Sequence, residues 1–362
     1  MSNNNIAINK EIYIEVLRIF AIFFVIFNHT GDFGFILFSK FQPSNYCFWI
    51  DMFWSIFCKF AVPVFFALSG ALLIGKNENL KDLFTKRISK ILTVLFFVSI
   101  IYYIGGSFIQ HYDISFIKFF KNLYKGGIRI HLWYLYAYIA FLLTLPILRN
   151  IAKSLTKMNY IYITILSVIF FGIIPILEYL LFNNNLHLYK HINPEWICST
   201  IFIYPLLGYF MATKVTNEEI KKSLPYLWGI NIIAIIITGL SIYHLGSNLG
   251  SFASEKNIQI FHKNFAIINC ICIFLTAKYF IPKININNTI QKIILSIGKC
   301  TFGIYLMHML LKDILFMIFK SFVENNHSII VAFVTSLIIL ALCYTFTLIV
   351  KRIPYIKKIF GY

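Results

Sequence analysis

Long apolar runs separated by short polar connections make up almost the whole chain, and this alternation predicts its fold class. A helix that crosses a bilayer needs about 20 mostly apolar residues. Runs of that kind lie at roughly 11–30, 52–75, 83–105, 131–150, 158–182, 196–213, 225–245, 262–281, 297–319 and 328–350. The pattern therefore predicts an all-α polytopic membrane protein, a bundle of about ten transmembrane helices.

The composition agrees with this prediction. Hydrophobic residues make up 59% of the 362 positions and charged residues 13%, and the mean hydropathy is +0.77, which excludes an ordinary soluble protein. The first apolar run carries Glu15 and Arg18 and precedes no small-residue cleavage site, so it is not a cleavable signal peptide. We expect a single integral-membrane domain over residues 1–362.

The formal net charge of +18 is distributed over short segments between the apolar runs rather than gathered in one basic patch. We therefore expect the lipid bilayer as a partner, and no nucleic acid. Lys and Arg are concentrated in alternate connections, most densely at Lys76, Lys81, Lys86, Arg87 and Lys90. Because cytoplasmic loops carry the excess of Lys and Arg, this distribution predicts that both termini are cytoplasmic.

Seven cysteines are scattered along the chain, mostly in apolar runs: Cys47, Cys58, Cys198, Cys270, Cys272, Cys300 and Cys343. Their spacing matches neither a zinc motif nor a disulfide framework. We assign them no chemistry and expect no metal site.

Arg18 and His29 are the polar pair of the first span. A separation of eleven residues is about 20° more than three helical turns, so one helix would place both on one face, ~16 Å apart along its axis. A charged side chain within a bilayer costs about 2.5–3.5 kcal/mol, so we expect Arg18 and Glu15 to face the bundle interior, close enough to pair. Alternatively, Arg18 reaches the inner surface and His29 caps the helix.

The second span, DMFWSIFCKFAVPVFFALSGALLIG, contains a proline, a Ser-Gly pair and a lysine. Pro63 can kink the helix and Gly70 permits close helix contact, so packing is a sufficient explanation for Ser69 and Gly70. It is insufficient for Lys59, because an ammonium group in hydrocarbon needs a partner or an aqueous cavity.

KDLFTKRISK opens the third span and places three basic residues, Lys86, Arg87 and Lys90, at the cytoplasmic surface. One explanation for these basic residues is positive-inside topology together with binding of lipid phosphates. The other explanation is that they form a phosphate site for a soluble cytoplasmic ligand.

Two later segments add histidines. His131, Trp133 and Tyr134, in HLWYL at the start of the fourth span, mark the outer membrane interface, where an aromatic belt alone would explain Trp133 and Tyr134. His308 lies near mid-membrane in the ninth span, GKCTFGIYLMHMLLKDILF, and a histidine that only packs is the alternative explanation there.

Five of these segments, taken in order, resemble the motifs of acyltransferase family 3, multi-spanning membrane enzymes that O-acylate surface polysaccharides, peptidoglycan and related glycans. They are the R-x10-H pair Arg18 and His29, KFAVPVFFALSGALL, KRISKIL, HLWYL and TFGIYLMH. The resemblance extends from about residue 11 to about residue 310. Two of these segments depart from the family's pattern: Lys59 replaces an arginine of many relatives, and Lys86-Arg87 replaces the Arg-x-Arg of some members.

The resemblance implies a membrane-bound O-acyltransferase, most often an O-acetyltransferase, in the bacterial cytoplasmic membrane. Its donor would be a cytoplasmic acyl-CoA, commonly acetyl-CoA, used as a co-substrate with no bound cofactor. Its acceptor would be a hydroxyl of a surface polysaccharide or of a lipid-linked glycan.

The same resemblance implies roles for particular residues. His29 and Arg18 would be catalytic, and Arg18 would also contact the donor. We expect the donor phosphates at Lys86, Arg87 and Lys90. The remaining residues expected in or beside the pocket are Glu15, Asp32, Lys59, Ser69, His131, Trp133, Tyr305 and His308.

Acyl transfer from a thioester to a hydroxyl needs a base and a group that stabilises the oxyanion. His29 suits the first task, because the unperturbed pKa of histidine, about 6.5, lies near working pH. Lys59 or a backbone N–H would serve the second. Asp32 would orient the imidazole if the helix continued that far, although Gly31 favours a loop. A covalent route through Ser69 is the alternative, disfavoured by its predicted depth nearer the inner leaflet.

Two other classes of function remain open at this point. A transporter or flippase also uses intramembrane Arg, Lys, Glu and His, although the sequence shows no repeat of two halves. A membrane scaffold without chemistry would require Arg18, Lys59 and His308 all to be packing residues. Product analysis separates the first two classes, because an enzyme leaves an ester on its acceptor and a carrier leaves its substrate unchanged.

Overall fold

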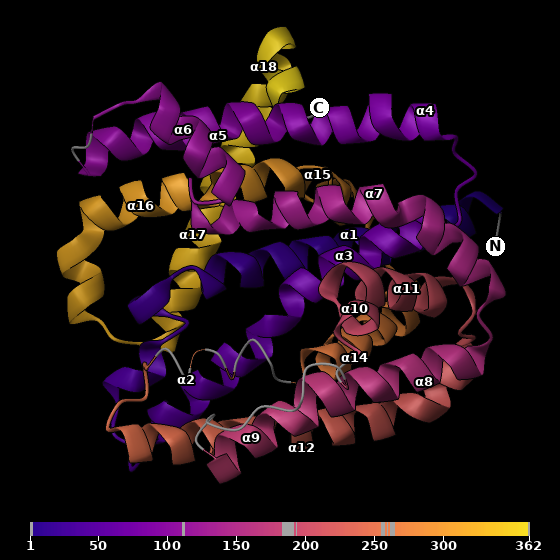
Figure 1. Cartoon of the computed structure of the whole chain (residues 1–362), viewed down its shortest axis with the longest axis horizontal. Coiled ribbons are helices and arrows are strands. Elements are labelled where there is room, and N and C mark those ends of the chain that lie inside the picture. Colours follow the sequence, from indigo (N-terminus) through magenta and orange to yellow (C-terminus); the bar gives the residue numbers. More distant parts are fainter. Residues whose placement is uncertain are drawn as a thin grey trace.

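The computed structural model describes residues 3–110, 113–182, 194–254 and 265–360, with the isolated positions 192, 258 and 260. Helices form nearly all of this part of the chain, and no strand occurs in it. Most of the long helices run side by side across the view of Figure 1, with α1 (Asn3–Asn28) near the middle of the bundle.

The helices follow one another with short connections. In the first half of the chain they are α2 Tyr46–Phe57, α3 Ala61–Leu73, α4 Leu80–Asp82, α5 Ser89–Gln110, α6 Phe116–Lys125, α7 Trp133–Ser154, α8 Lys157–Val168 and α9 Ile174–Phe182. In the second half they are α10 Glu195–Cys198, α11 Thr200–Thr213, α12 Asn217–Leu249, α14 Ala266–Phe280, α15 Asn288–Gly298, α16 Thr301–Asn325, α17 Ile329–Arg352 and α18 Pro354–Ile359. Short 3-10 turns lie at Gly31–Phe33, Leu37–Lys40, Cys58–Phe60, Ile130–Leu132 and Ile281–Lys283, and π-helical turns at Leu83–Ile88 and Ile169–Ile173.

The described residues contain eight helical segments that are long and apolar enough to cross a membrane. They are Tyr46–Leu73, Leu80–Phe108, Ile130–Ser154, Lys157–Phe182, Asn217–Leu249, Ala266–Lys283, Thr301–Phe319 and Ile329–Arg352. The other two predicted spans correspond to α1, which carries the charged pair, and to α11, which is apolar but shorter. The predicted all-α polytopic membrane fold is therefore confirmed.

The first span ends earlier than its apolar pattern predicts. α1 ends at Asn28, and the Thr30 hydroxyl donates a hydrogen bond at 2.6 Å to the Phe27 carbonyl, one of those that the helix end leaves open. Gly31 follows with φ +59°, a left-handed conformation that turns the chain and favours glycine. His29 therefore lies on the turn after α1 and not within the helix.

The second span consists of two helices. The 3-10 turn Cys58–Phe60 separates α2 from α3. Pro63, expected to kink the middle of one helix, is instead the third residue of α3, where its missing N–H leaves no helical hydrogen bond unmade.

α3 and α11 pack backbone against backbone. A Cβ added at Gly70 would collide with the carbonyl of Pro205, and one added at Gly208 would collide with the carbonyl of Ala67. The close helix contact predicted for Gly70 is present, and a second glycine on the partner helix makes it reciprocal.

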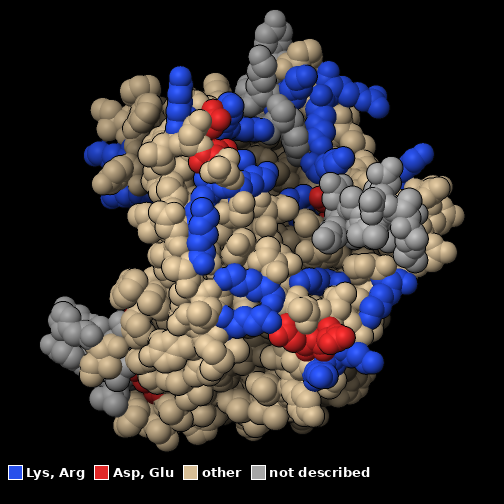
Figure 2. Space-filling model, turned by 90° about the vertical axis from the view of Figure 1, so that its right-hand side faces the viewer, with Lys and Arg blue, Asp and Glu red and all other residues tan. Residues whose placement is uncertain are grey.

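Figure 2 looks onto the end of the bundle that lies on the right in Figure 1, where α1 and α4 begin. Lys and Arg side chains are spread over this face and outnumber the Asp and Glu side chains visible there. Such an excess is typical of a cytoplasmic side, which is the orientation predicted for this end.

Candidate functional site

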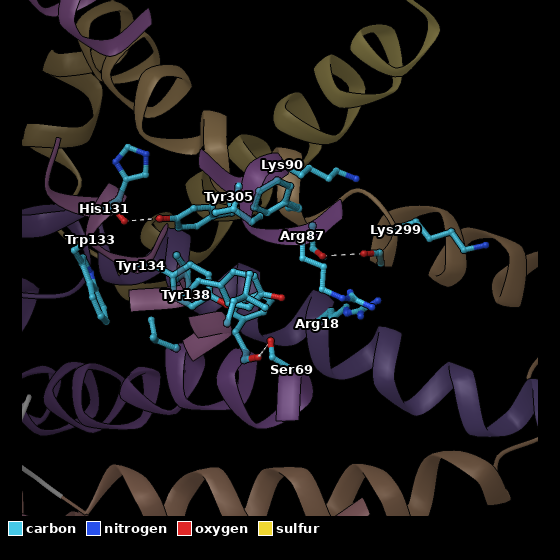
Figure 3. Close-up of a pocket in the computed structure, with 18 of the residues that line it drawn as sticks. Arg18, Ser69, Arg87, Lys90, His131, Trp133, Tyr134, Tyr138, Lys299 and Tyr305 are labelled. Carbon is cyan, nitrogen blue, oxygen red and sulfur yellow. Dashed lines mark hydrogen bonds between the residues drawn. The ribbon is translucent and has the colours of Figure 1, made fainter. Parts of the chain in front are cut away.

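A cavity of about 410 Å³ lies between α1, α3, α5, α7 and the junction of α15 with α16. We call it the main cavity. In Figure 3, Arg18 and Arg87 point toward each other beside Tyr138, while Lys90 and Lys299 extend to the right. Its polar and aromatic lining residues are Arg18, His29, Phe65, Ser69, Lys86, Arg87, Lys90, His131, Trp133, Tyr134, Tyr138, Lys299, Thr301, Phe302 and Tyr305.

Cations gather at one end of the main cavity. Arg18 comes from α1, Lys86 and Arg87 from the π-helical turn, Lys90 from α5, and Lys299 from the turn before α16. Figure 3 shows Arg18, Arg87 and Lys299 on the same side of the pocket. Among the described residues no Asp or Glu lines the cavity, so this end suits a ligand with several negative charges, such as phosphate groups.

A carboxylate outside the cavity holds Arg87 in place. Glu78 accepts two hydrogen bonds from Arg87 Nε, at 2.8 and 2.9 Å, and one from Arg149 Nη2 at 3.1 Å. Burial alone would raise the pKa of the Glu78 carboxyl, but the two guanidinium groups outweigh it and lower the pKa below its usual value. Arg149 also donates to the carbonyls of Leu73 and Glu78, so the network fixes the loop before α4.

A second carboxylate orients Arg18. Nη1 of Arg18 donates to Oε1 of Glu15 at 2.5 Å, and Glu15 itself is buried. Its other oxygen, Oε2, has no hydrogen-bond partner among the described residues. A Cβ added at Gly298 would occupy the space of this oxygen. The absence of a side chain at residue 298 is therefore what leaves room for the Glu15–Arg18 pair.

Three histidines lie together at the other end: His29 and His131 line the main cavity, and His308 lies behind them. The ring centroids of His308 and His29 lie 5.2 Å apart, and those of His308 and His131 lie 5.1 Å apart. Nδ1 of His308 lies 2.6 Å from the Tyr305 carbonyl, which can only accept, so in this contact Nδ1 is the donor. Nε2 of His308 and both ring nitrogens of His131 are buried without a partner in the described part of the chain. Buried polar atoms without a partner are rare in proteins, and here they lie directly beside His29.

An ion cluster lies near these histidines: Asp313 pairs with Lys312 at 3.1 Å and also with Arg129. Within the described ranges, no three His, Cys, Asp or Glu side chains are placed to hold a metal ion.

The main cavity brings together most of the residues that the sequence indicated: Arg18, His29, Ser69, Lys86, Arg87, Lys90, His131, Trp133 and Tyr305. Arg18 and His29 line the same cavity even though His29 lies beyond the end of α1. The Ser69 hydroxyl lines the wall between them and donates to the Phe65 carbonyl at 2.8 Å. The chemical roles assigned to these side chains stay predictions.

The remaining predicted residues lie outside the main cavity. Glu15 supports Arg18, and His308 lies against His29, as described above. Lys59 lines a second cavity, together with His29. The expectation that Asp32 orients the imidazole is wrong, because α1 ends before it and its side chain, 63% exposed, pairs with Lys40 at 3.9 Å.

Sequence reasoning missed part of the lining. Tyr134 and Tyr138 lie one turn apart on α7, and their rings stack at 5.9 Å between centroids. Their i,i+4 spacing is a signal that they share one face, but an aromatic belt has the same signature. Lys299 has no distinguishing signal, since basic residues flank most spans.

The comparison with known families is consistent with this site. A family model described as an acyltransferase domain matches residues 11–348, nearly the whole chain. The comparisons with curated proteins and with solved structures gave no match. Every residue that lines the main cavity falls within the matched range. The chain belongs to acyltransferase family 3 and is a multi-pass membrane acyltransferase.

Proposed function

We propose that this enzyme transfers an acyl group, most often acetyl, from a cytoplasmic acyl-CoA to a hydroxyl of a cell-surface glycan or of its lipid-linked precursor. It would act in the bacterial cytoplasmic membrane. The observation that carries the proposal is a single cavity with five cations at one end and His29 at the other.

The cationic end would bind the phosphates of the donor. Lys86, Arg87, Lys90 and Lys299 supply positive charge, and Arg18, deeper along α1, would contact the pantetheine arm or the thioester. An extended arm suits this layout, because Arg18 and the end of α1 at Asn28 are separated by about 15 Å along the helix axis. Only part of this positive charge is neutralised by neighbouring carboxylates, since Lys90 and Lys299 pair with none among the described residues.

The reaction would proceed by direct transfer. His29 takes the proton of the acceptor hydroxyl as its oxygen forms a bond to the thioester carbon. The carbonyl oxygen becomes an oxyanion, which the ammonium of Lys59 would stabilise. The C–S bond then breaks, and the imidazolium returns its proton to the leaving CoA thiolate. The products are an ester and free CoA, and no acyl-enzyme is needed.

The direct test compares surface glycans from cells that contain the chain with those from cells that lack it. Mass spectrometry should find an ester of acetyl mass on the glycan only when the active protein is present, and should identify the carrier. A matching experiment with purified protein should show release of free CoA from acetyl-CoA that depends on added glycan.

Identical glycans in both strains, together with no binding of acetyl-CoA by the purified protein, would overturn the proposal. Unmodified glycan or lipid-linked precursor that accumulates on one side of the membrane in the strain that lacks the chain would instead indicate a carrier. In that case the intramembrane Arg, Lys and His side chains would serve transport.

A further inference from the structure

A second cavity, of about 300 Å³, meets the main cavity at His29. The two cavities share Val25, His29, Val62 and Trp133. Among the described residues that line both, His29 is the only one with a titratable side chain. A group that reached His29 through the second cavity would therefore approach it from a different side than a ligand in the main cavity.

Hydrogen-bonding side chains with little net charge line the second cavity. Asn28, Thr200 and Tyr204 contribute an amide and two hydroxyls, and Trp133 contributes an indole ring. Lys59 is its one cation: Nζ donates to Oδ1 of Asn28 at 2.6 Å and pairs with no carboxylate in the described ranges. This chemistry differs from that of the main cavity and fits a neutral, polyhydroxylated ligand better than a nucleotide.

Interrupted backbone produces this cavity. α1 ends beside it, the 3-10 turn Cys58–Phe60 crosses it, and α11 and α14 begin at it with Thr200 and Ala266. α11 has 14 residues, so at 1.5 Å per residue it is ~21 Å long, short of the ~30 Å hydrocarbon core, and we expect one of its ends at membrane depth. Non-helical backbone at membrane depth is tolerated where it lines a polar cavity.

A third cavity, of about 310 Å³, continues the path away from the main cavity. It shares Thr200 and Tyr204 with the second cavity and reaches Gly172 in the π-helical turn Ile169–Ile173 and Glu195 in α10. π-helical turns are frequent at functional sites. Thr200 and Tyr204 therefore lie where the second and third cavities join.

We propose that the second cavity is the acceptor site and holds the sugar unit whose hydroxyl is acylated. This inference rests on the function proposed above. The sugar enters past Thr200 and Tyr204, which together with Asn28 bind its other hydroxyls, and it presents one hydroxyl to His29, while Lys59 remains for the oxyanion. The donor thioester reaches the same imidazole from the main cavity, so the two substrates never share a path.

The test is a substitution that fills the second cavity without touching the main one. Thr200→Trp should lower the acetyl ester on isolated surface glycan by about tenfold or more in cells that contain only this variant. The dissociation constant of acetyl-CoA for the purified full-length protein, measured by calorimetry in nanodiscs, should change less than about twofold. Thr345→Trp makes the same change on an exposed face of α17 and should match the unmodified protein in both measurements.

Tyr204→Phe is a second variant that removes one hydroxyl and little volume, in case the tryptophan disturbs folding. It should raise the glycan concentration needed for half-maximal acetylation severalfold, again with acetyl-CoA binding unchanged. Full glycan acetylation by folded Thr200→Trp, or weaker acetyl-CoA binding in either variant, would overturn the acceptor site. Failure of the unmodified protein to acetylate glycan or to bind acetyl-CoA would overturn the proposed function instead, so the two failures are distinguishable.

Discussion

The two ends of the main cavity differ in how their side chains are held. At the basic end, Arg18 and Arg87 are fixed by Glu15 and Glu78, and their satisfied hydrogen bonds leave net positive charge facing the cavity. At the histidine end, ring nitrogens of His131 and His308 are buried without partners in the described part of the chain.

Under the proposed function, this difference would separate donor binding from chemistry. A preformed set of cations binds a charged ligand without rearrangement, which suits the phosphates of a nucleotide. Buried imidazole nitrogens without partners cost free energy, and a cost of that kind is typical of a functional site. Substitutions at the two ends should therefore change different kinetic constants.

The largest expected effect is at the histidine end. His29→Ala should lower kcat by about two to four orders of magnitude, because general base catalysis is lost, while the KM for acetyl-CoA stays close to its original value. Steady-state measurement of CoA release with purified protein checks this. His244→Ala, at an exposed position of α12, is the matched control. A His29→Ala variant that keeps its kcat would remove this residue from the mechanism.

The opposite pattern is expected at the basic end. Lys299→Glu should raise the KM for acetyl-CoA by about tenfold and leave kcat nearly unchanged, because a charge-assisted hydrogen bond to a phosphate contributes about 1.5–3 kcal/mol. The loss should be smaller at high ionic strength. Lys222→Glu, an exposed lysine of α12 outside the cavity, should have no such effect. A kcat effect equal to that of His29→Ala would contradict the separation of the two ends.

Gly298→Ala should have an intermediate effect on both stability and binding. The new methyl group would collide with the Glu15 carboxylate, cost about 1–3 kcal/mol of unfolding free energy and displace Arg18. We expect a KM for acetyl-CoA raised severalfold and a lower melting temperature. Gly229→Ala is the control: a Cβ there meets nothing within 4 Å, so helix propensity should make it neutral or stabilising. Equal melting temperatures for the two variants would disprove the packing argument.

The smallest expected effect is a pH dependence of stability. Because the pKa of folded Glu78 is below its usual value of 4.5, its stabilisation is fully present above that value and is lost as the pH falls through the folded pKa. Glu78→Gln should therefore melt at a lower temperature than the unmodified protein at pH 7. The difference in melting temperature between the two proteins should disappear at acid pH. Glu218→Gln controls for loss of an exposed carboxylate. A difference that persists at the lowest pH would exclude the ionised pair as its cause.

The sequence was sufficient for the fold because membrane spans are set by length and apolarity, which are local properties. The predicted spans at 83–105 and 158–182 lie within helical segments of the structure, and the span at 328–350 begins one residue before its helix. The points at which helices end or are interrupted were less visible in the sequence. The end of α1 at Asn28 depends on a hydroxyl–carbonyl hydrogen bond from Thr30, and the turn Cys58–Phe60 lies within an uninterrupted apolar run.

The candidate site was only partly predictable, because a cavity is made by helices that meet in space. Charge in an apolar run identified Arg18 and Lys59 as interior residues, but not that they line different cavities. Lys299 looks like any basic residue beside a span. Gly298 has significance only through Glu15, which is far from it in sequence and in contact with it in the structure.

The reciprocal glycines of α3 and α11 have a consequence for how substrates exchange. With Gly70 against Pro205 and Gly208 against Ala67, the two backbones lie so close that a Cβ at either glycine would clash. We expect the two helices to move as one unit, which carries Ser69 in the main cavity and Thr200 in the second cavity. Product release would then come from displacement of the helices opposite this pair, and crosslinks that join α3 to α11 should leave turnover intact.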